Sequence, residues 1–517
     1  MSDNLRQLLE QRVAEYGAKL FLFSEADGRE WSYEEFDSAA NRTANMLRSR
    51  GISKGDVVSL LMPNSAEYII AYFACWKIGA IAGPVNSLLK AEEIAWVVGN
   101  SESKIILLTE PPMLNDSGYP GVPFVNFSNA DEATAGFPDT LDAVDLGTDD
   151  DAIIIYTSGT TGKPKGCLLT HGNLIANARQ ISDWMRFGPD DRLLTIMPLF
   201  HMNAVSVTTM TALYAGGSTV VSPKFSASRF WEIIEKYQIT SFGSVATMLS
   251  MLLAKAEPPA SAGGSDLADR STPGASTNAT SSNSLRFAMC GSAPVPAEIL
   301  RRFEETFNCL VIEGYGLSES TCRSTFNPPN EGRRPGSCGL PIGNEMKVVD
   351  DEDIDVADGE LGEIVMRGPN ICKEYFKNPE ATSKAFAGGW FHTGDIGYRD
   401  ADGFFYIADR KSDMIIRGGE NIYPREIDDL LFTHPAIESA AAIGVPDELY
   451  GEEVTAFVVL KAGTATTENE IIAFCREHLA DFKCPKTVHF LREIPKGPTG
   501  KLLKRQLATF FAEARTK

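Results

Sequence analysis

A segment rich in hydroxyls, glycines and lysines, YTSGTTGKPKG at residues 156–166, is the strongest chemical feature of the sequence. It follows directly after the apolar run AIIIY, so we expect a turn after a strand. Hydroxyls and backbone amides on such a turn can hold phosphate oxygens, and Lys163 and Lys165 add positive charge for a polyphosphate. The spacing differs from a Walker A loop, and Pro164 follows the lysine where a helix should open. The alternative is a plain surface turn.

Six further motifs are spread over most of the chain. They are MPLFH (197–201), GSAPV (291–295), EGYGLSES (313–320), WFHTGD (390–395), DRKSDMIIRGGENIYPREID (409–428) and GPTGKLLKRQL (497–507). Together with residues 156–166 they resemble, in type and order, the signatures of the adenylate-forming superfamily. That superfamily includes acyl-CoA synthetases, firefly luciferase and the adenylation domains of peptide synthetases. The resemblance implies a phosphate loop, an aromatic gate, adenine, magnesium and ribose motifs, a hinge and a catalytic lysine.

The resemblance also implies a reaction, in which a carboxylic acid is activated as its acyl-adenylate and then passed to a thiol. ATP, Mg²⁺ and coenzyme A would be required. A carboxylate is a poor electrophile, so its oxygen must first attack the α-phosphorus of ATP, and pyrophosphate leaves. Because negative charge crowds that transition state, fixed positive groups must meet it. By resemblance Lys501 bridges the carboxylate and the α-phosphate; the alternative is a solvated lysine near the end of the chain.

The resemblance assigns roles around the nucleotide. Glu319 would hold Mg²⁺, since hard cations prefer carboxylate oxygen, and Ser318 would donate to the α-phosphate. Tyr315 would stack on adenine, or be a buried core tyrosine. Asp395 and Arg410 would contact the ribose; their alternative is a surface ion pair or turn cap. The other implied nucleotide-binding positions are Thr157, Ser158, Gly159, Thr160, Thr161, Gly162, Lys163, Lys165, Gly291, Ser292, Ala293, Glu313, Gly314, Gly316 and Asn421.

For the second half-reaction, the resemblance implies that a small C-terminal domain rotates about a hinge. The hinge position is Ser412, where Asp or Lys is more usual, and serine can still absorb the change in φ and ψ. Gly418 and Gly419 fit close backbone approach to a thin pantetheine arm, or a plain β-turn. His201 resembles the aromatic residue that gates the acyl pocket and the thiol tunnel; the alternative is a structural histidine.

The acyl pocket is less well marked. By position its walls should include Asn203, Val207 and Ala246. Arg323, in SESTCRSTFNPP, could bind a second anion of the substrate bidentately; the alternative is a surface arginine paired with an acidic residue.

The sequence around this arginine also indicates which class of acid is the substrate. The segment NPPNEGRRPGSCG resembles ligases of short dicarboxylates such as oxalate and malonate, and KEYFKNPEATSKAF resembles bacterial carnitine/crotonobetaine–CoA ligases. We therefore expect a short acid with a polar or anionic tail, such as a dicarboxylate or a sulfonate of the sulfoacetate type. Alternatives are a medium- or long-chain fatty acid–CoA ligase, transfer of the acyl group to a carrier protein, and an inactive nucleotide-binding protein.

The elements that position these motifs alternate between strand and helix, which predicts α/β layers with largely parallel sheets. VVSLLM (57–62) and KIILLTE (104–110) are predicted strands. We expect a large N-terminal AMP-binding domain of layered α/β subdomains at 1–408 and a small mobile α+β lid domain at 409–517. Residues 256–284, rich in Ser, Ala, Gly, Pro and Thr, are predicted to be a mobile loop, with a domain linker as the alternative.

Composition narrows the function further. A net charge of −21 and a pI near 4.8 argue against nucleic-acid binding, which needs clustered Lys and Arg. Nine unpatterned cysteines indicate reduced thiols in the cytoplasm, and six scattered histidines predict no zinc site. The apolar run at 68–85 contains Lys77, so it is predicted to be a buried helix running into a strand, not a membrane span. A homodimer is left open.

Overall fold

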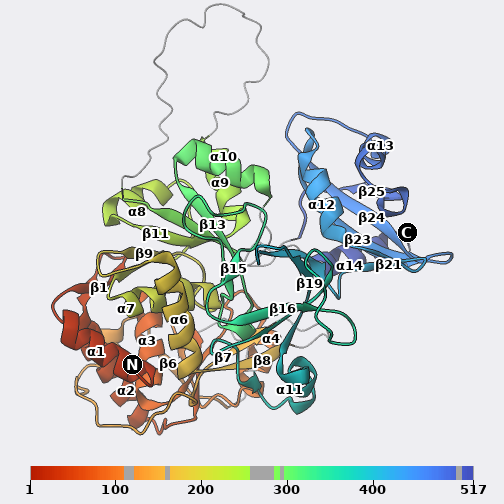
Figure 1. The fold of residues 1–517 in the computed structure, drawn as a ribbon. Coiled ribbons are helices and arrows are strands. Elements are labelled where there is room, and N and C mark those ends of the chain that lie inside the picture. Colours follow the sequence, from red (N-terminus) through yellow and green to blue (C-terminus); the bar gives the residue numbers. More distant parts are fainter. Residues whose placement is uncertain are drawn as a thin grey trace, which may run out of the picture.

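The computed structural model describes residues 2–109, 121–157, 164–256, 284–291, 296–495 and 503–515. Helices and strands alternate along the chain in four sheets, with a large N-terminal part and a smaller C-terminal part (Figure 1), which confirms the predicted α/β class. The predicted loop at 256–284 lies outside the described residues except for its two ends.

The largest sheet has nine strands in the order β15-β14-β13-β12-β11-β9-β10-β1-β2. Its central strands are parallel, while β2, β14 and β15 are added antiparallel at the edges. The strands are β1 (Leu20–Ser24), β2 (Glu30–Ser32), β9 (Arg192–Thr195), β10 (Ser218–Val221), β11 (Ser241–Ser244), β12 (Phe287–Cys290), β13 (Leu310–Tyr315), β14 (Thr325–Phe326) and β15 (Leu340–Pro341).

The second sheet has seven strands in the order β18-β8-β7-β4-β3-β5-β6. The strands from β7 to β6 are parallel, and β8 and β18 are antiparallel to their neighbours. The bounds are β3 (Val57–Leu61), β4 (Ile81–Pro84), β5 (Ile105–Leu108), β6 (Phe124–Asn126), β7 (Asp151–Thr157), β8 (Lys165–Thr170) and β18 (Glu374–Tyr375). Strands β3 and β5 confirm the predictions at 57–62 and 104–110.

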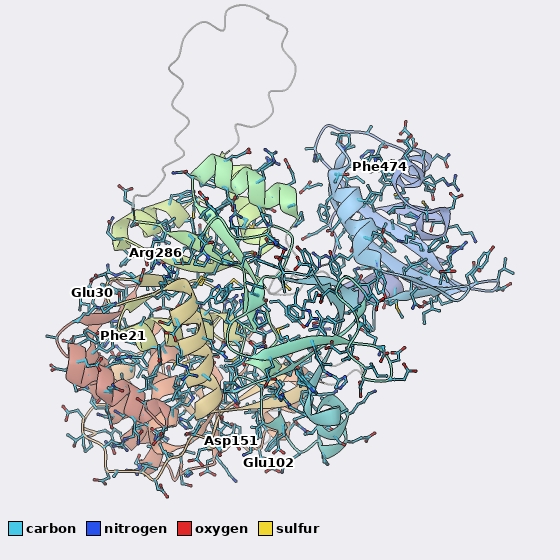
Figure 2. All side chains as sticks on the ribbon, viewed as in Figure 1. Phe21, Glu30, Glu102, Asp151, Arg286 and Phe474 are labelled. Atoms are coloured by element: carbon cyan, nitrogen blue, oxygen red, sulfur yellow. The ribbon has the colours of Figure 1, made fainter. Side chains whose placement is uncertain are left out.

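Helices and helical turns connect and cover these two sheets. They are α1 (Leu5–Tyr16), α2 (Tyr33–Ser49), α3 (Ala66–Ile78), α4 (Ala91–Asn100), α5 (Ala130–Ala133), α6 (His171–Met185), a π-helix (Asn203–Met210), α7 (Thr211–Ala215), α8 (Phe230–Tyr237), α9 (Ala246–Ala256) and α10 (Ala297–Phe307). One apolar core spans both sheets and includes Phe21, which Figure 2 labels among the N-terminal elements.

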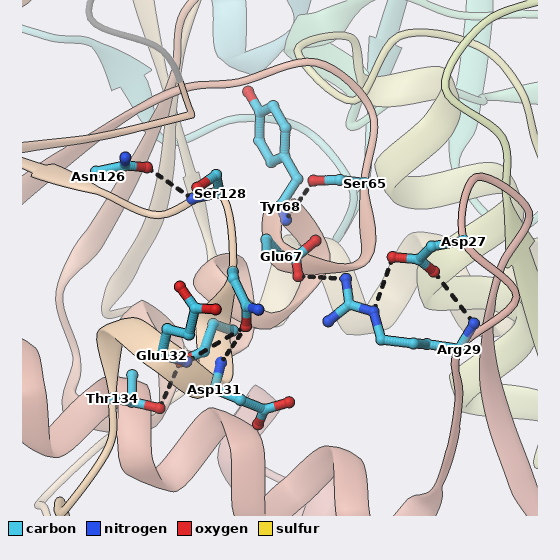
Figure 3. Close-up of polar contacts among 12 residues, drawn as sticks. Asp27, Arg29, Ser65, Glu67, Tyr68, Asn126, Ser128, Asp131, Glu132 and Thr134 are labelled. Carbon is cyan, nitrogen blue, oxygen red and sulfur yellow. Dashed lines mark hydrogen bonds and ion pairs between the residues drawn. The ribbon is translucent and has the colours of Figure 1, made fainter.

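Helix α3 is buried along its whole length and runs into β4, as predicted for the apolar run at 68–85. Ser65 caps its first turn by accepting from the amide of Tyr68 at 3.2 Å (Figure 3). Beside it, the guanidinium of Arg29 donates to the buried carboxylate of Glu67 at 2.6 Å. No helix in the described part of the chain has the length and apolarity to cross a membrane.

The third sheet is antiparallel, in the order β16-β17-β19-β20, and lies between the N-terminal sheets and the C-terminal elements (Figure 1). Its strands are β16 (Glu345–Val349), β17 (Gly362–Arg367), β19 (Phe391–Arg399) and β20 (Phe405–Arg410), with α11 (Pro379–Ala385) between β17 and β19 in sequence. The proposed domain boundary at 408/409 therefore falls inside β20.

The C-terminal unit has its own sheet and its own apolar cores. Strand β24 is paired with β21, β23 and β25, and the unit ends in α14. The elements are β21 (Ile415–Arg417), β22 (Glu420–Ile422), α12 (Pro424–Thr433), β23 (Ile437–Asp447), β24 (Gly451–Leu460), α13 (Glu468–His478), β25 (Thr487–Phe490) and α14 (Lys504–Arg515). Figure 2 labels Phe474, from α13, on this unit.

Candidate active site

Several of the predicted motifs lie where strands of the two large sheets end, at β7, β9, β12 and β13. Thr157 is the last residue of β7 and Lys165 the first of β8, so the predicted phosphate loop joins these two strands. The EGYG motif ends β13, and a short 3₁₀ turn at Ser318–Ser320 follows it. Several predicted positions lie outside the described residues, namely Ser158, Gly159, Thr160, Thr161, Gly162, Lys163, Ser292, Ala293 and Lys501.

Glu319 connects the loop after β13 to the phosphate-loop strands. Its Oε1 accepts a hydrogen bond from Thr157 Oγ1 at 3.3 Å and another from the hydroxyl of Tyr375 at 3.0 Å. Its carbonyl accepts from the amide of Cys372 at 2.7 Å. The ammonium of Lys165 lies 5.1 Å from the centroid of the Tyr375 ring, a cation–π distance. A carboxylate, hydroxyls and a cation are thus collected at one point.

Sequence reasoning missed Tyr375. It reaches the site because β18 pairs antiparallel with β8 and sets Tyr375 opposite Cys167, a pairing that no local pattern around KEYFKNP indicates. Burial, together with the nearby charge of Glu319, raises the pKa of Tyr375, so its hydroxyl stays a neutral donor.

Glu319 fits the kind of magnesium site that depends on its substrate. Magnesium commonly takes one or two carboxylates from the protein and completes its shell with phosphate oxygens and water. Among the described residues, no group of three or more His, Cys, Asp or Glu could hold a metal alone. The single carboxylate of Glu319, beside Ser318 and the strands of the predicted phosphate loop, matches the substrate-dependent arrangement.

Tyr315, Asp395 and Arg410 form a second polar group. Asp395 and Arg410 are paired residues on β19 and β20, and Arg410 Nε lies 2.9 Å from Asp395 Oδ1. The hydroxyl of Tyr315 donates to Asp395 Oδ2 at 2.6 Å. Burial raises the pKa of Tyr315, and the charge of Asp395 raises it further. A carboxylate only accepts hydrogen bonds, which makes Asp395 chemically suited to the hydroxyls of a ribose.

Arg323 is buried, with an exposed fraction of 1%, so the alternative of a surface arginine is wrong. Its backbone carbonyl accepts from Asn177 Nδ2 at 2.6 Å. The two residues before it, Thr321 and Cys322, have φ values of 60° and 126°, which non-glycine residues rarely adopt. This strained turn sets the direction in which the side chain of Arg323 points.

The guanidinium of Arg323 is incompletely paired. Its Nη1 donates to the Cys322 carbonyl at 3.2 Å, while the buried Nε and Nη2 have no hydrogen-bond partner among the described residues. The head lies over Gly291, where an added Cβ would come 2.6 Å from the carbonyl oxygen of Gly314 and 2.7 Å from Arg323 Nη2. A glycine is therefore required beneath it.

Asn203 and His201 supply more unpaired polar atoms. Both amide atoms of Asn203 and Nε2 of His201 are buried and find no hydrogen-bond partner in the part of the chain that the structure describes. A Cβ at Gly243 would come 2.6 Å from Asn203 Oδ1. Because Gly243 pairs with Met289, two residues before Gly291, both glycines face the same side of the sheet. Burial lowers the pKa of His201 to about 4, so its ring is neutral near pH 7.

Other predicted residues lie apart from these groups. Gly418 and Gly419 have φ values of 60° and 91° and form the two-residue turn between β21 and β22, while Asn421 is exposed on β22. Ser412 is exposed between β20 and β21. Val207 is buried in the π-helix, Ala246 begins α9, and Gly314 and Gly316 lie at or beyond the end of β13.

Glu313 turns its side chain toward the loop after β14, where Oε2 accepts from the amide of Gly336 at 3.0 Å. Burial raises its pKa to about 7.

Comparison with known proteins agrees with this geometry. The AMP-binding enzyme family matches residues 9–376, and the AMP-binding enzyme C-terminal domain matches residues 426–501. The sulfoacetate–CoA ligase of Cupriavidus necator is 35% identical over 98% of this chain and 97% of its own. The oxalate–CoA ligase of Arabidopsis thaliana is 35% identical over 99% of both chains. The crystal structure of ATP-bound MatB from Rhodopseudomonas palustris aligns with a TM-score of 0.89 at 31% identity, covering 99% of both chains.

These matches extend over nearly the whole chain and confirm the superfamily predicted from the motifs. The chain therefore belongs to the AMP-binding enzyme family, as an AMP-forming acid–thiol ligase of the acyl-CoA synthetase type.

Proposed function

We propose that the enzyme joins a short acid carrying a second anionic group to coenzyme A, with ATP and Mg²⁺. The observation that carries the choice of acid is the buried Arg323 guanidinium with unpaired Nε and Nη2. These two nitrogens form one edge of the guanidinium, the edge that binds a carboxylate or sulfonate through two parallel hydrogen bonds.

An unpaired buried charge is costly, and a bound anion would offset that cost. The unpaired amide of Asn203 on the same side of the sheet supports a polar tail on the acid and argues against an alkyl chain. The names of the relatives agree, since sulfoacetate and oxalate each carry an anionic group besides the carboxylate that is joined to CoA.

In the first half-reaction a carboxylate oxygen of the acid bonds to the α-phosphorus of ATP, and the bond to pyrophosphate breaks. Lys501 would neutralise charge between the carboxylate and the α-phosphate, and Asp395 with Arg410 would hold the ribose. Mg²⁺, held by Glu319, would supply positive charge to the phosphates. In the second half-reaction the CoA sulfur bonds to the acyl carbon after loss of its proton, and AMP leaves.

The acid is tested by pyrophosphate exchange with a panel of monocarboxylic, dicarboxylic and sulfonated short acids. We expect the second anion to raise kcat/KM in the wild type. Arg323→Met, similar in length and uncharged, should lower kcat/KM on the best dianionic acid by about 30-fold to 1,000-fold, the usual loss for a buried charge pair. Arg323→Lys should recover part of it.

The control is Arg301→Met on the exposed surface of α10, which should leave kcat/KM unchanged. ATP affinity measured by calorimetry checks that Arg323→Met is folded. Full activity of Arg323→Met on the best dianionic acid would overturn the proposed substrate class.

Lys501 is tested by separating the half-reactions. Lys501→Ala should lose most pyrophosphate exchange, because the charge at the α-phosphate is no longer met. It should still form thioester from acyl-adenylate and CoA supplied to it. A variant that exchanges pyrophosphate at the wild-type rate would remove Lys501 from the mechanism.

A further inference from the structure

The first turn of α12 has no acceptor from its own N-cap residue. Tyr423 occupies the cap position without a side-chain hydrogen bond, and Pro424 at the first helical position has no amide hydrogen. Arg425 therefore has the first amide that needs an acceptor, and Asp409 Oδ2 accepts it at 2.8 Å. Aspartate is a preferred N-cap side chain, but this one lies 16 residues upstream.

Asp409 belongs to the third sheet and not to the C-terminal unit. It pairs with Ile396 across β19 and β20, and its Oδ1 accepts from the amide of Arg410 at 2.8 Å. The guanidinium of Arg425 also donates to the carbonyl of Ile407 on β20. The N-terminus of α12 is thus held to β20 by a backbone bond and a side-chain bond.

The chain between these partners contains the proposed hinge. On one side, the amide of Lys411 donates to the carbonyl of Gly394 at 2.8 Å, which fastens the chain to the third sheet. On the other side, Ile415 is already part of the C-terminal core. The joining segment is therefore residues 412–414, and a rotation there must break the Asp409–Arg425 bond.

A second contact lies beside this cap. Lys504, at the start of α14, is 2.9 Å from Asp428 Oδ2 on α12. The pKa of Lys504 is raised: burial opposes the shift, and the charges of Asp428 and Asp409 outweigh it. The ammonium of Lys504 therefore also faces Asp409 in this orientation. In Figure 1, β21, which leads into the Gly418–Gly419 turn, lies on the side of the C-terminal unit away from β13.

We propose that Asp409 is a positioning residue that caps α12 across the hinge and holds the C-terminal unit in the orientation that favours adenylation. The cap opens when the unit turns for thioester formation. This inference rests on the two half-reactions of the proposed function.

The half-reactions test the cap. Asp409→Ala should lower pyrophosphate exchange about fivefold to tenfold, the usual effect of a lost N-cap, without lowering thioester formation from supplied acyl-adenylate. Asp409→Asn keeps a carbonyl acceptor and should restore most of the exchange. The matched control is Asp351→Ala, an exposed acid that pairs with Lys411 on the same side of the hinge and makes no hydrogen bond to α12 among the described residues. It should behave as wild type.

Hydrogen exchange tests the cap in the protein without substrates. The Arg425 amide should exchange about fivefold to tenfold faster in Asp409→Ala than in wild type or Asp409→Asn. Equal exchange rates in all three, or equal losses in both half-reactions, would overturn the inference. The two proposals can fail separately. If no acid in the panel supports turnover but the Arg425 amide exchanges as expected, the proposed function is wrong and the role of Asp409 as the cap of α12 remains supported.

Discussion

At the residue scale, two buried ionisable side chains flank the end of β13 and differ in how they are satisfied. Arg323 carries a permanent charge, and two of its donors have no partner within the described ranges. Glu313 has a hydrogen bond from Gly336, yet burial raises its pKa to about 7, so near neutral pH it is held between its two protonation states. The donors of Arg323 are available to an anionic ligand. The ionisation of Glu313 makes the unfolding free energy of the protein depend on pH.

Glu313→Gln isolates that pH dependence. The folded pKa of about 7 lies above the ordinary value of 4.5, so the folded protein binds the proton more tightly. The contribution is full below about pH 4.5 and is lost as pH rises toward 7. From pH 5 to pH 8, the unfolding free energy of the wild type should fall by roughly 1 to 3 kcal/mol more than that of the variant. Urea unfolding at both pH values measures it; parallel changes in the two proteins would contradict the assignment.

At the element scale, α3 shows how a helix can be buried on every side. Its one lysine, Lys77, has an exposed fraction of 1%, and its ammonium bonds to the carboxylate of Asp37 on α2. Asp37 also accepts from Asn41 Nδ2 at 2.9 Å, so the carboxylate has a second partner and the ammonium depends on the first. Burial lowers the pKa of Lys77, and the charge of Asp37 is the main influence that opposes this shift.

This asymmetry predicts unequal costs. Asp37→Ala should lower the unfolding free energy by about 3 to 5 kcal/mol, because the ammonium is left buried without a partner. Lys77→Met should cost about 1 kcal/mol, since its methylenes are replaced and Asp37 keeps Asn41. The double variant Asp37→Ala/Lys77→Met should have a higher unfolding free energy than Asp37→Ala alone. Urea unfolding of the three variants is the measurement, and equal losses in the single variants would refute this account.

Motif and periodicity predicted the elements well where the signal is local. The apolar run at 68–85 identified α3 and β4, and the hydroxyl-rich segment was placed between two strands. The pairing of strands that lie far apart in the sequence could not be predicted from local patterns. Tyr375 meets Glu319 through the β18–β8 pairing, and Arg323 is buried by a strained turn that its neighbours' residue types do not indicate. A sequence shows which residues could do chemistry, while burial decides which of them lack a partner.

At the scale of the whole molecule, the N-terminal and C-terminal parts have separate cores. Ile427 on α12 belongs to the C-terminal core and Ile153 on β7 to the N-terminal one. The short joining segment and the contacts of Arg425 with β20 link the two parts. A substitution in one core should therefore lower the stability of the part that contains it and leave the other part largely unaffected.

Calorimetry can test this independence. Ile427→Ala and Ile153→Ala both remove a fully buried side chain and should each cost about 2 to 5 kcal/mol. We expect two heat-absorption transitions, with each variant shifting a different one. A single transition that moves equally in both variants would show that the chain unfolds as one unit.

The glycines beneath the polar heads of Asn203 and Arg323 have an evolutionary consequence. One methyl group at Gly243 would collide with Asn203 Oδ1, whereas one at Gly291 would meet the Gly314 carbonyl oxygen as well as Arg323 Nη2. The codons for glycine and alanine differ by a single base. Under the proposed function, one base change at Gly243 would therefore alter which acids the enzyme accepts, while Glu319, Asp395 and Arg410 stayed as they are.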